Sequence, residues 1–209
     1  MAKNLDSKCK LCRREGAKLM LKGERCFTPK CAVVKRNYPP GIHGPKGRGR
    51  ASGYSMQLRE KQKAKKIYNL LEKQFKLTFA RAIKQKGDAG ENLIKLLETR
   101  LDNVIFRLAL ASSRSQARQL VNHRHFTVNN RIVNIPSYQT KSGDIIKIKK
   151  SSSTGKHFVN ITDRLKKAII PGWLNFDIQE MAAKVLHLPA KNDFEQGINT
   201  QQIVEFYSR

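Results

Sequence analysis

The feature of this sequence that most restricts its folding is an excess of positive charge. Forty-two lysines and arginines face only sixteen acidic residues among 209, which gives a formal net charge of +26 at pH 7. A folded chain with this charge repels itself unless a polyanion neutralises it. Hydrophobic residues still make up 39% of the sequence, enough for a buried core, so we do not expect a disordered basic tail.

The excess charge is unevenly distributed along the chain. Residues 1–150 carry a net charge of +25, whereas residues 151–209 carry only +1. A single lysine run is usually a solvated surface, but an excess of this size favours nucleic acid as the partner. Aromatic residues make up only 7% of the chain, and no RNP-type aromatic run, basic zipper or zinc-finger histidine pair is found. We therefore expect binding to folded RNA through its shape and its phosphates.

The sequence gives no sign of a membrane or secreted protein. The longest stretch without Asp, Glu, Lys or Arg is nine residues, for example 168–176, whereas a transmembrane helix needs about 20 predominantly apolar residues. The first residues lack the apolar core of a signal peptide. We expect a cytoplasmic protein with no membrane partner and no small-molecule substrate.

All four cysteines lie within the first 31 residues, as Cys9, Cys12, Cys26 and Cys31. Their C-x2-C-x13-C-x4-C spacing is typical of a four-cysteine zinc site, in which every position is filled and the metal is structural. Six basic residues surround the cysteines and would keep this knuckle positive: Lys8, Lys10, Arg13, Arg14, Arg25 and Lys30. Two disulfides are disfavoured inside a cell, and an iron–sulfur cluster is a weaker alternative. The pattern predicts one structural Zn²⁺.

Residues 38–53 contain five glycines and three prolines, which argues against a helix or a strand there. Glycines interleave Lys46, Arg48 and Arg50, and they let the backbone approach phosphates closely. A flexible linker is the alternative interpretation. The segment lacks the G-x4-G-K-[ST] pattern, so no ATP site is indicated.

In the next part of the chain, apolar residues recur with helical periodicity. We expect helices over 56–75, 79–86 and 91–110, with a break at Gly87. The last of these helices would bury one apolar stripe made of Leu93, Leu97, Leu101, Ile105 and Leu108.

A small α+β unit is predicted after Ala111. Ser113 and Gln116 form a capping box for a helix over 114–123. Residues 126–133 then read as a hairpin whose two central asparagines can adopt the positive φ angles of a type I′ turn. A further strand begins near Ile146.

The residues of this unit resemble a known family. Segments 100–103, 113–121, 128–129 and 142–146 look like an S-four RNA-binding domain. Four further segments resemble the bacterial small-subunit ribosomal protein S-four family, so that the resemblance covers nearly the whole chain: 39–44 (PPGIHG), 57–63 (QLREKQK), 90–93 (GENL) and 203–208 (IVEFYS). One departure is Asn130, where the family usually has Gly; Asn tolerates positive φ.

The resemblance implies an α+β protein in which a small RNA-binding domain is inserted into a largely helical N- and C-terminal domain. The implied domains are 1–98 with the zinc knuckle, the basic linker and helices, 99–160 as the RNA-binding domain, and 161–209 completing the helical domain. Some members of the family have the four-cysteine zinc knuckle and others lack it.

The resemblance also implies a function. Such a protein would be a structural constituent of the small ribosomal subunit that binds the 5′ region of 16S-type rRNA early and nucleates assembly of the subunit body. It would contact ribosomal protein S-five and other small-subunit proteins, influence translational accuracy, and line the mRNA entrance channel. Some members of the family also repress their own mRNA.

We expect the RNA contacts to come from basic side chains along residues 1–131. The candidate RNA-binding residues are Lys8, Lys10, Arg13, Arg14, Lys46, Arg48, Arg50, Arg59, Lys61, Lys63, Arg114, Arg118 and Arg131. The same module occurs in RNA-modifying enzymes, but the 59 residues after Lys150 are too few for a catalytic domain, so we expect no enzyme activity. A stand-alone RNA chaperone is the remaining alternative.

Overall fold

The computed structural model describes residues 4–47, 49–153, 155, 158, 165 and 168–208. The described chain divides into two compact units. Unit 1 contains the residues up to Leu93 together with those from Glu195 onward, and unit 2 is Ile94–Phe194. Among the described helices, none has the length and apolar composition needed to cross a bilayer.

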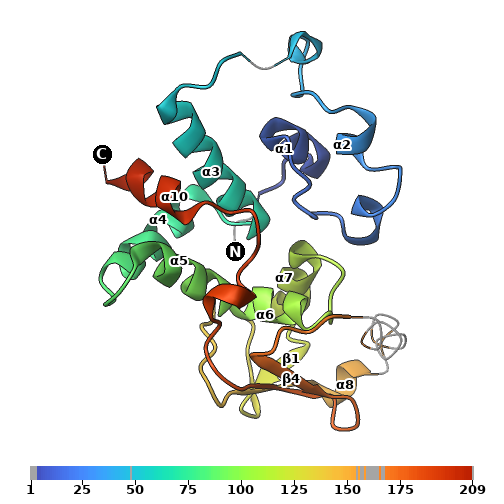
Figure 1. Ribbon diagram of the computed structural model, residues 1–209. Helices are drawn as coiled ribbons and strands as arrows, with labels where there is room; N and C mark the ends of the chain where they lie inside the picture. The colour runs from blue at the N-terminus through green and yellow to red at the C-terminus, as the bar shows by residue number, and fades with distance from the viewer. Residues whose placement is uncertain are drawn as a thin grey trace. The chain divides into compact units, whose positions relative to one another are not determined.

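Unit 1 begins with short elements and continues with longer helices. Its elements are α1 (Lys8–Glu15), η1 (Gly23–Cys26), α2 (Ala32–Lys35), η2 (Gly44–Lys46), α3 (Gly53–Ile67), α4 (Glu72–Ile83), the first half of α5 (Ala89–Glu98) and α10 (Thr200–Tyr207). Helix α10 packs against α3, as Figure 1 shows, although the two helices are far apart in sequence. The ring of Tyr207 lies 4.5 Å from that of Phe79, centroid to centroid, so aromatic contacts help to hold the returning segment in place.

The single helix predicted over 56–75 is wrong. Helix α3 ends at Ile67, and α4 starts at Glu72. Asn69 takes a positive φ of 53°, and the Leu70 N–H donates to the Lys65 carbonyl over 3.0 Å. Asparagine favours this left-handed closure of a helix end, and its local effect outweighs the apolar periodicity.

Unit 2 combines helices with one antiparallel sheet. The elements are α6 (Leu101–Arg107), α7 (Arg114–Asn122), β1 (Phe126–Val128), β2 (Arg131–Ile132), β3 (Ile145–Ile148), α8 (Lys150–Ser153), β4 (Leu174–Asp177), β5 (Ala182–Val185) and η3 (Lys191–Asp193). The strand order is β2-β1-β3-β5-β4. The core lies between this sheet and helices α6 and α7, and it includes the predicted residues Leu101, Ile105 and Leu108.

The local signals of the RNA-binding module are confirmed in part. Asn129 and Asn130 have φ angles of 49° and 64°, as a type I′ turn requires. Ser113 Oγ accepts the Gln116 N–H over 3.3 Å. The Gln116 side chain, however, accepts from the backbone N–H and hydroxyl of Ser112, at 2.8 and 2.6 Å. The cap is therefore present, but the reciprocal bond goes to the preceding serine.

The helix predicted over 91–110 is divided in two. Thr99 and Arg100 separate α5 from α6, and Arg100 has an extended backbone. The Leu101 N–H donates to the Tyr138 carbonyl over 2.8 Å, and the Thr140 N–H donates to the Thr99 carbonyl over 2.9 Å. This short pairing with a distant segment takes the hydrogen bonds that a continuous helix would have made.

The expectation that residues 161–209 complete the helical domain differs from the structure. Strand β5 pairs with β3, β4 pairs with β5, and the segment up to Phe194 belongs to unit 2. Trp173 and Val185 are fully buried in the core of that unit. Both residues belong to the same core cluster as residues of α6 and α7, which is consistent with the segment up to Phe194 being part of unit 2.

Candidate nucleic-acid interface

The basic residues of α3 are largely neutralised within unit 1. Lys61 and Lys65 donate to Glu72 over 2.7 and 2.8 Å, and Lys63 lies 3.3 Å from Glu60. Glu15, whose side chain is 1% exposed, pairs with Arg59 over 3.2 Å and also with Lys66. The pairs with Glu15 and Glu72 join α3 to α1 and to α4, whereas the Lys63–Glu60 pair lies within α3.

Lys61, one of the predicted RNA contacts, lies inside unit 1. The residue is 5% exposed, and its ammonium group lies 4.7 Å from the centroid of the Phe206 ring. Tyr207 donates its hydroxyl to Glu72 over 3.1 Å. Burial alone would raise the pKa of Glu72, but hydrogen bonds from Lys61 and Lys65 lower it to about 2. The pKa of Tyr207 is raised, mainly by burial and secondly by the negative charge of Glu72. Lys61 thus belongs to the α3–α10 contact.

Arg114 and Arg118, two further predicted RNA contacts, are also buried, and only 7% and 6% of their surface is exposed. Arg114 Nε donates to Asn103 Oδ1 over 2.7 Å, and its guanidinium lies 4.5 Å from the centroid of the Phe106 ring. Arg118 lies 3.5 Å from Asp102, and burial lowers its pKa although Asp102 opposes this shift. Both arginines lie on the buried face of α7, together with Ala117 and Val121.

The end of α7 and the hairpin keep exposed polar residues. Gln119, Asn122, Arg124 and the predicted Arg131 are all exposed. Arg124 was not among the predicted contacts, and it has a positive φ of 61° directly after the helix. A non-glycine residue in that conformation is uncommon, but the sequence carries no signal that would reveal it.

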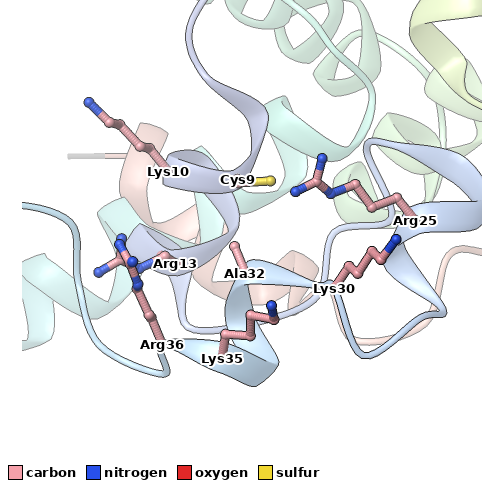
Figure 2. Close-up of a pocket in the computed structure, with 8 residues that line it drawn as sticks. All are labelled: Cys9, Lys10, Arg13, Arg25, Lys30, Ala32, Lys35 and Arg36. Atoms are coloured by element: carbon pink, nitrogen blue, oxygen red, sulfur yellow. The ribbon is translucent and has the colours of Figure 1, made fainter.

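The clearest concentration of unneutralised charge lies in the N-terminal part of unit 1. A hollow of about 450 Å³ opens there, and Figure 2 shows its side chains. We call it the basic hollow, and its lining residues are Cys9, Lys10, Arg13, Arg25, Lys30, Ala32, Lys35 and Arg36. Six of the eight are lysine or arginine, and none is acidic. Such a surface attracts phosphate groups.

Three short elements and their flanking residues build the basic hollow. Helix α1 supplies Lys10 and Arg13, η1 supplies Arg25, and α2 supplies Lys35. Arg13 is fixed by backbone carbonyls, because it donates to Tyr38 over 3.0 Å and to Pro39 over 3.2 Å. Its guanidinium also lies 4.6 Å from the centroid of the Tyr38 ring. One wall of the hollow is therefore held in place before any ligand arrives.

The other predicted contacts are distributed around this hollow. Lys8 is half-buried and donates to the Asn4 carbonyl over 2.7 Å. Arg14 and Arg50 are exposed and line a second hollow beside the Pro39–Gly44 backbone. Lys46 is exposed at the end of η2, and Arg48 lies outside the described residues.

Lys35 and Arg36 line the basic hollow but were not among the candidate RNA-binding residues. They follow Cys31 by four and five residues. That spacing was the available signal, because a turn closed at Cys31 brings both residues back toward α1.

The four cysteines meet at one small cavity, which we call the cysteine cavity. All are free thiols; Cys12, Cys26 and Cys31 are buried, and Cys9 is half-buried. Burial raises the pKa of the Cys12 thiol, and the other three thiols add to this effect. The Lys22 N–H points at Cys26 Sγ from 3.3 Å. Within the described part of the chain, however, no three Cys, His, Asp or Glu side chains are arranged as a set of metal ligands.

Comparisons with known proteins identify the family of this chain. The family model for the ribosomal protein S4/S9 N-terminal domain matches residues 3–98, and that for the S4 domain matches residues 99–146. The small ribosomal subunit proteins uS4 of Heliobacterium modesticaldum and Caldicellulosiruptor saccharolyticus are each 52% identical over the full length of both chains. The uS4 protein of Clostridioides difficile is 50% identical, again over both full lengths. The chain therefore belongs to the uS4 family of small ribosomal subunit proteins.

Proposed function

We propose that this protein is a structural, rRNA-binding constituent of the small ribosomal subunit in the cytoplasm. Its relationship to proteins of that subunit extends over the full length of both chains. The single structural observation that supports RNA binding best is the basic hollow, where six cations meet and no carboxylate lines the wall. The family is one of ribosomal structural proteins, not of enzymes.

The finer role that we propose is early binding to the 5′ region of 16S-type rRNA. Arg13, anchored on the Tyr38 and Pro39 carbonyls, gives a preformed cationic surface. A preformed surface loses little conformational entropy on binding, which suits a protein that binds first and orders RNA for later ones. We further propose contacts with ribosomal protein S-five and other small-subunit proteins, and with mRNA at the entrance channel.

A competition in salt tests the rRNA proposal. The whole protein is titrated with a 5′-region fragment of small-subunit rRNA and with an unrelated structured RNA of equal length, across a range of salt concentrations. A preference for the 5′ fragment that persists as salt rises supports the proposal, because specific contacts survive screening. Equal affinities with equal salt dependence would favour the alternative, a stand-alone RNA chaperone that binds by charge.

We also propose that the cysteines hold one structural zinc ion. The donor set suits four-coordinate Zn²⁺, and all four thiols line the same cavity. As described, the thiols are not arranged as a ligand set, so binding would require their sulfur atoms to move into a ligand arrangement. A closed four-cysteine site leaves no open position for substrate, and the role of the ion would be to join α1, η1 and α2.

Metal analysis of the purified protein tests the zinc proposal. We expect one zinc per chain in the native protein, its loss in a Cys12→Ser variant, and loss of N-terminal helix with it. A Lys22→Ser variant, which alters the same cavity without removing a thiol, is expected to keep the metal. A native protein that is metal-free and fully folded over residues 4–47 would disprove the proposal.

A further inference from the structure

The two groups of basic residues in unit 1 differ in how they are neutralised. On α3, Arg59, Lys61, Lys63, Lys65 and Lys66 pair with three glutamates. In the basic hollow, Arg13 binds backbone carbonyls, and no ion pair is found within the described residues for the other five cations: Lys10, Arg25, Lys30, Lys35 and Arg36. Like charges gathered in one concave surface repel one another, and an anion that enters the hollow relieves this repulsion.

The basic hollow is built on the same residues as the cysteine cavity. Lys10, Arg13, Arg25 and Lys30 are each adjacent in sequence to a cysteine, and Lys35 and Arg36 follow Cys31 within about one helical turn. Cys9, Arg25 and Ala32 line both the hollow and the cavity. The positions of the six cations therefore depend on how the four cysteines are held.

The elements that present the cations are too short to be stable alone. Helix α1 has eight residues, and η1 and α2 have four each, whereas isolated helices shorter than about 12–15 residues are marginal in water. Contacts between α1 and α2 and the buried thiols of Cys12, Cys26 and Cys31 hold them together. If the cysteine cavity opens, the cations separate.

We propose that the basic hollow is a binding site for a compact cluster of RNA phosphates. We also propose that its affinity for phosphates is thermodynamically linked to the closed, buried packing of the four cysteines. One phosphate cannot neutralise six cations, so the fitting ligand is a place where a bent RNA backbone brings several phosphates together. This inference rests on the proposed rRNA-binding function and deepens it. Linkage is reciprocal: if intact cysteine packing strengthens phosphate binding, bound phosphates protect the cysteines to the same degree.

The first test measures whether the hollow, and not the total charge, binds a compact polyanion. The probe is sucrose octasulfate, whose clustered sulfates stand in for phosphates, titrated into the whole protein by calorimetry at physiological salt. The variant Lys35→Ala/Arg36→Ala removes two exposed cations from the hollow. The control Lys84→Ala/Lys86→Ala removes the same charge from exposed positions at the end of α4 and just beyond it.

We expect the hollow variant to lose about ten-fold in affinity for the probe and the control less than about two-fold, because Lys84 and Lys86 do not line the hollow and salt screens charges that do not contact the probe. Equal losses in the two variants would overturn the assignment of the site. Because all four substituted positions are exposed, unchanged circular dichroism is expected and is checked first.

The second test measures the linkage. The reagent that alkylates the four thiols is N-ethylmaleimide, which is uncharged and is therefore not itself attracted to the basic surface. We expect saturating octasulfate to slow alkylation several-fold in the native protein and in the α4 control, and to have little effect in Lys35→Ala/Arg36→Ala. Equal alkylation rates with and without the probe in the native protein would overturn the linkage.

The same variants distinguish this inference from the proposed function. If the native protein prefers the 5′ rRNA fragment but Lys35→Ala/Arg36→Ala binds it as tightly as the α4 control does, the hollow inference fails and rRNA binding stands. If the native protein shows no preference for that fragment while the hollow still binds octasulfate selectively, the proposed function fails on its own.

Discussion

Replacing Asp102 with Asn is expected to destabilise unit 2 strongly. Asp102 accepts hydrogen bonds from Arg100 over 3.0 and 2.8 Å and lies 3.5 Å from Arg118. The side chains of all three residues are at most 7% exposed. Breaking a buried ion pair by removing one partner costs about 3–5 kcal/mol. Because two buried guanidinium groups depend on this one carboxylate, we expect a loss of at least about 3 kcal/mol.

Trp173 makes this loss measurable. It is the only tryptophan of the chain and is fully buried in the core of unit 2, so its fluorescence in urea reports the unfolding of that unit. With a urea dependence of about 1–2 kcal/mol per molar, the midpoint for Asp102→Asn should fall by about 2 M.

Glu180→Gln is the matched control for this substitution. It changes charge equally but involves a 65% exposed side chain 3.7 Å from Lys147, and exposed pairs contribute at most about 1 kcal/mol. A shift for Asp102→Asn no larger than that of the control would refute the reasoning, because it would mean that the buried arginines do not need this carboxylate.

Three further predictions concern Arg118, Gly44 and Glu72. Arg118→Ala should lower the stability of unit 2 by about 1–3 kcal/mol and leave the salt dependence of rRNA binding unchanged, because the side chain is buried; a salt slope reduced by roughly 1 would instead indicate a phosphate contact. Gly44→Ala would place a Cβ 2.0 Å from the Pro39 carbonyl oxygen, so the backbone around these residues must move. We therefore expect a protease to cleave this segment faster in Gly44→Ala than in the control Gly49→Ala, where an added Cβ has no neighbour within 4 Å. Because the pKa of Glu72 is lowered to about 2 in the folded protein, its stabilising contribution is present above its ordinary pKa of 4.5 and is lost as the pH falls toward 2. With the Glu72 side chain 47% exposed, that contribution is about 1 kcal/mol, and thermal unfolding followed by circular dichroism should show native protein and Glu72→Gln converging in acid.

What the sequence could predict was local. Asn129 and Asn130 form their turn, Ser113 caps α7, and the stripe from Leu93 to Leu108 is buried, because each depends on residues a few positions apart. The clustering of the cysteines at one cavity also follows from their spacing, whereas the metal itself stays a prediction.

What the sequence could not predict depends on distant partners. The break at Arg100 needs the Tyr138 and Thr140 backbone, and the burial of Arg118 needs Asp102 from another helix. Helical periodicity places an arginine beside an apolar stripe but does not show whether a carboxylate from elsewhere will meet it. The addition of β4 and β5 to the sheet is likewise a long-range pairing, and the lower charge of residues 151–209 did not reveal which unit would receive them.

The division of unit 1 between two separate stretches of chain has a consequence for synthesis. A ribosome makes unit 2 as one continuous segment, and domains generally fold as units while the chain emerges. Unit 1 must wait for α10, which supplies the aromatic rings around the ammonium group of Lys61. A chain that stops after Phe194 is expected to show native Trp173 fluorescence beside an incomplete unit 1, with the Phe75 and Phe79 surfaces exposed to chaperones and proteases. A prematurely terminated chain would thus be marked by the exposed apolar surface of unit 1, most of which is synthesised before unit 2.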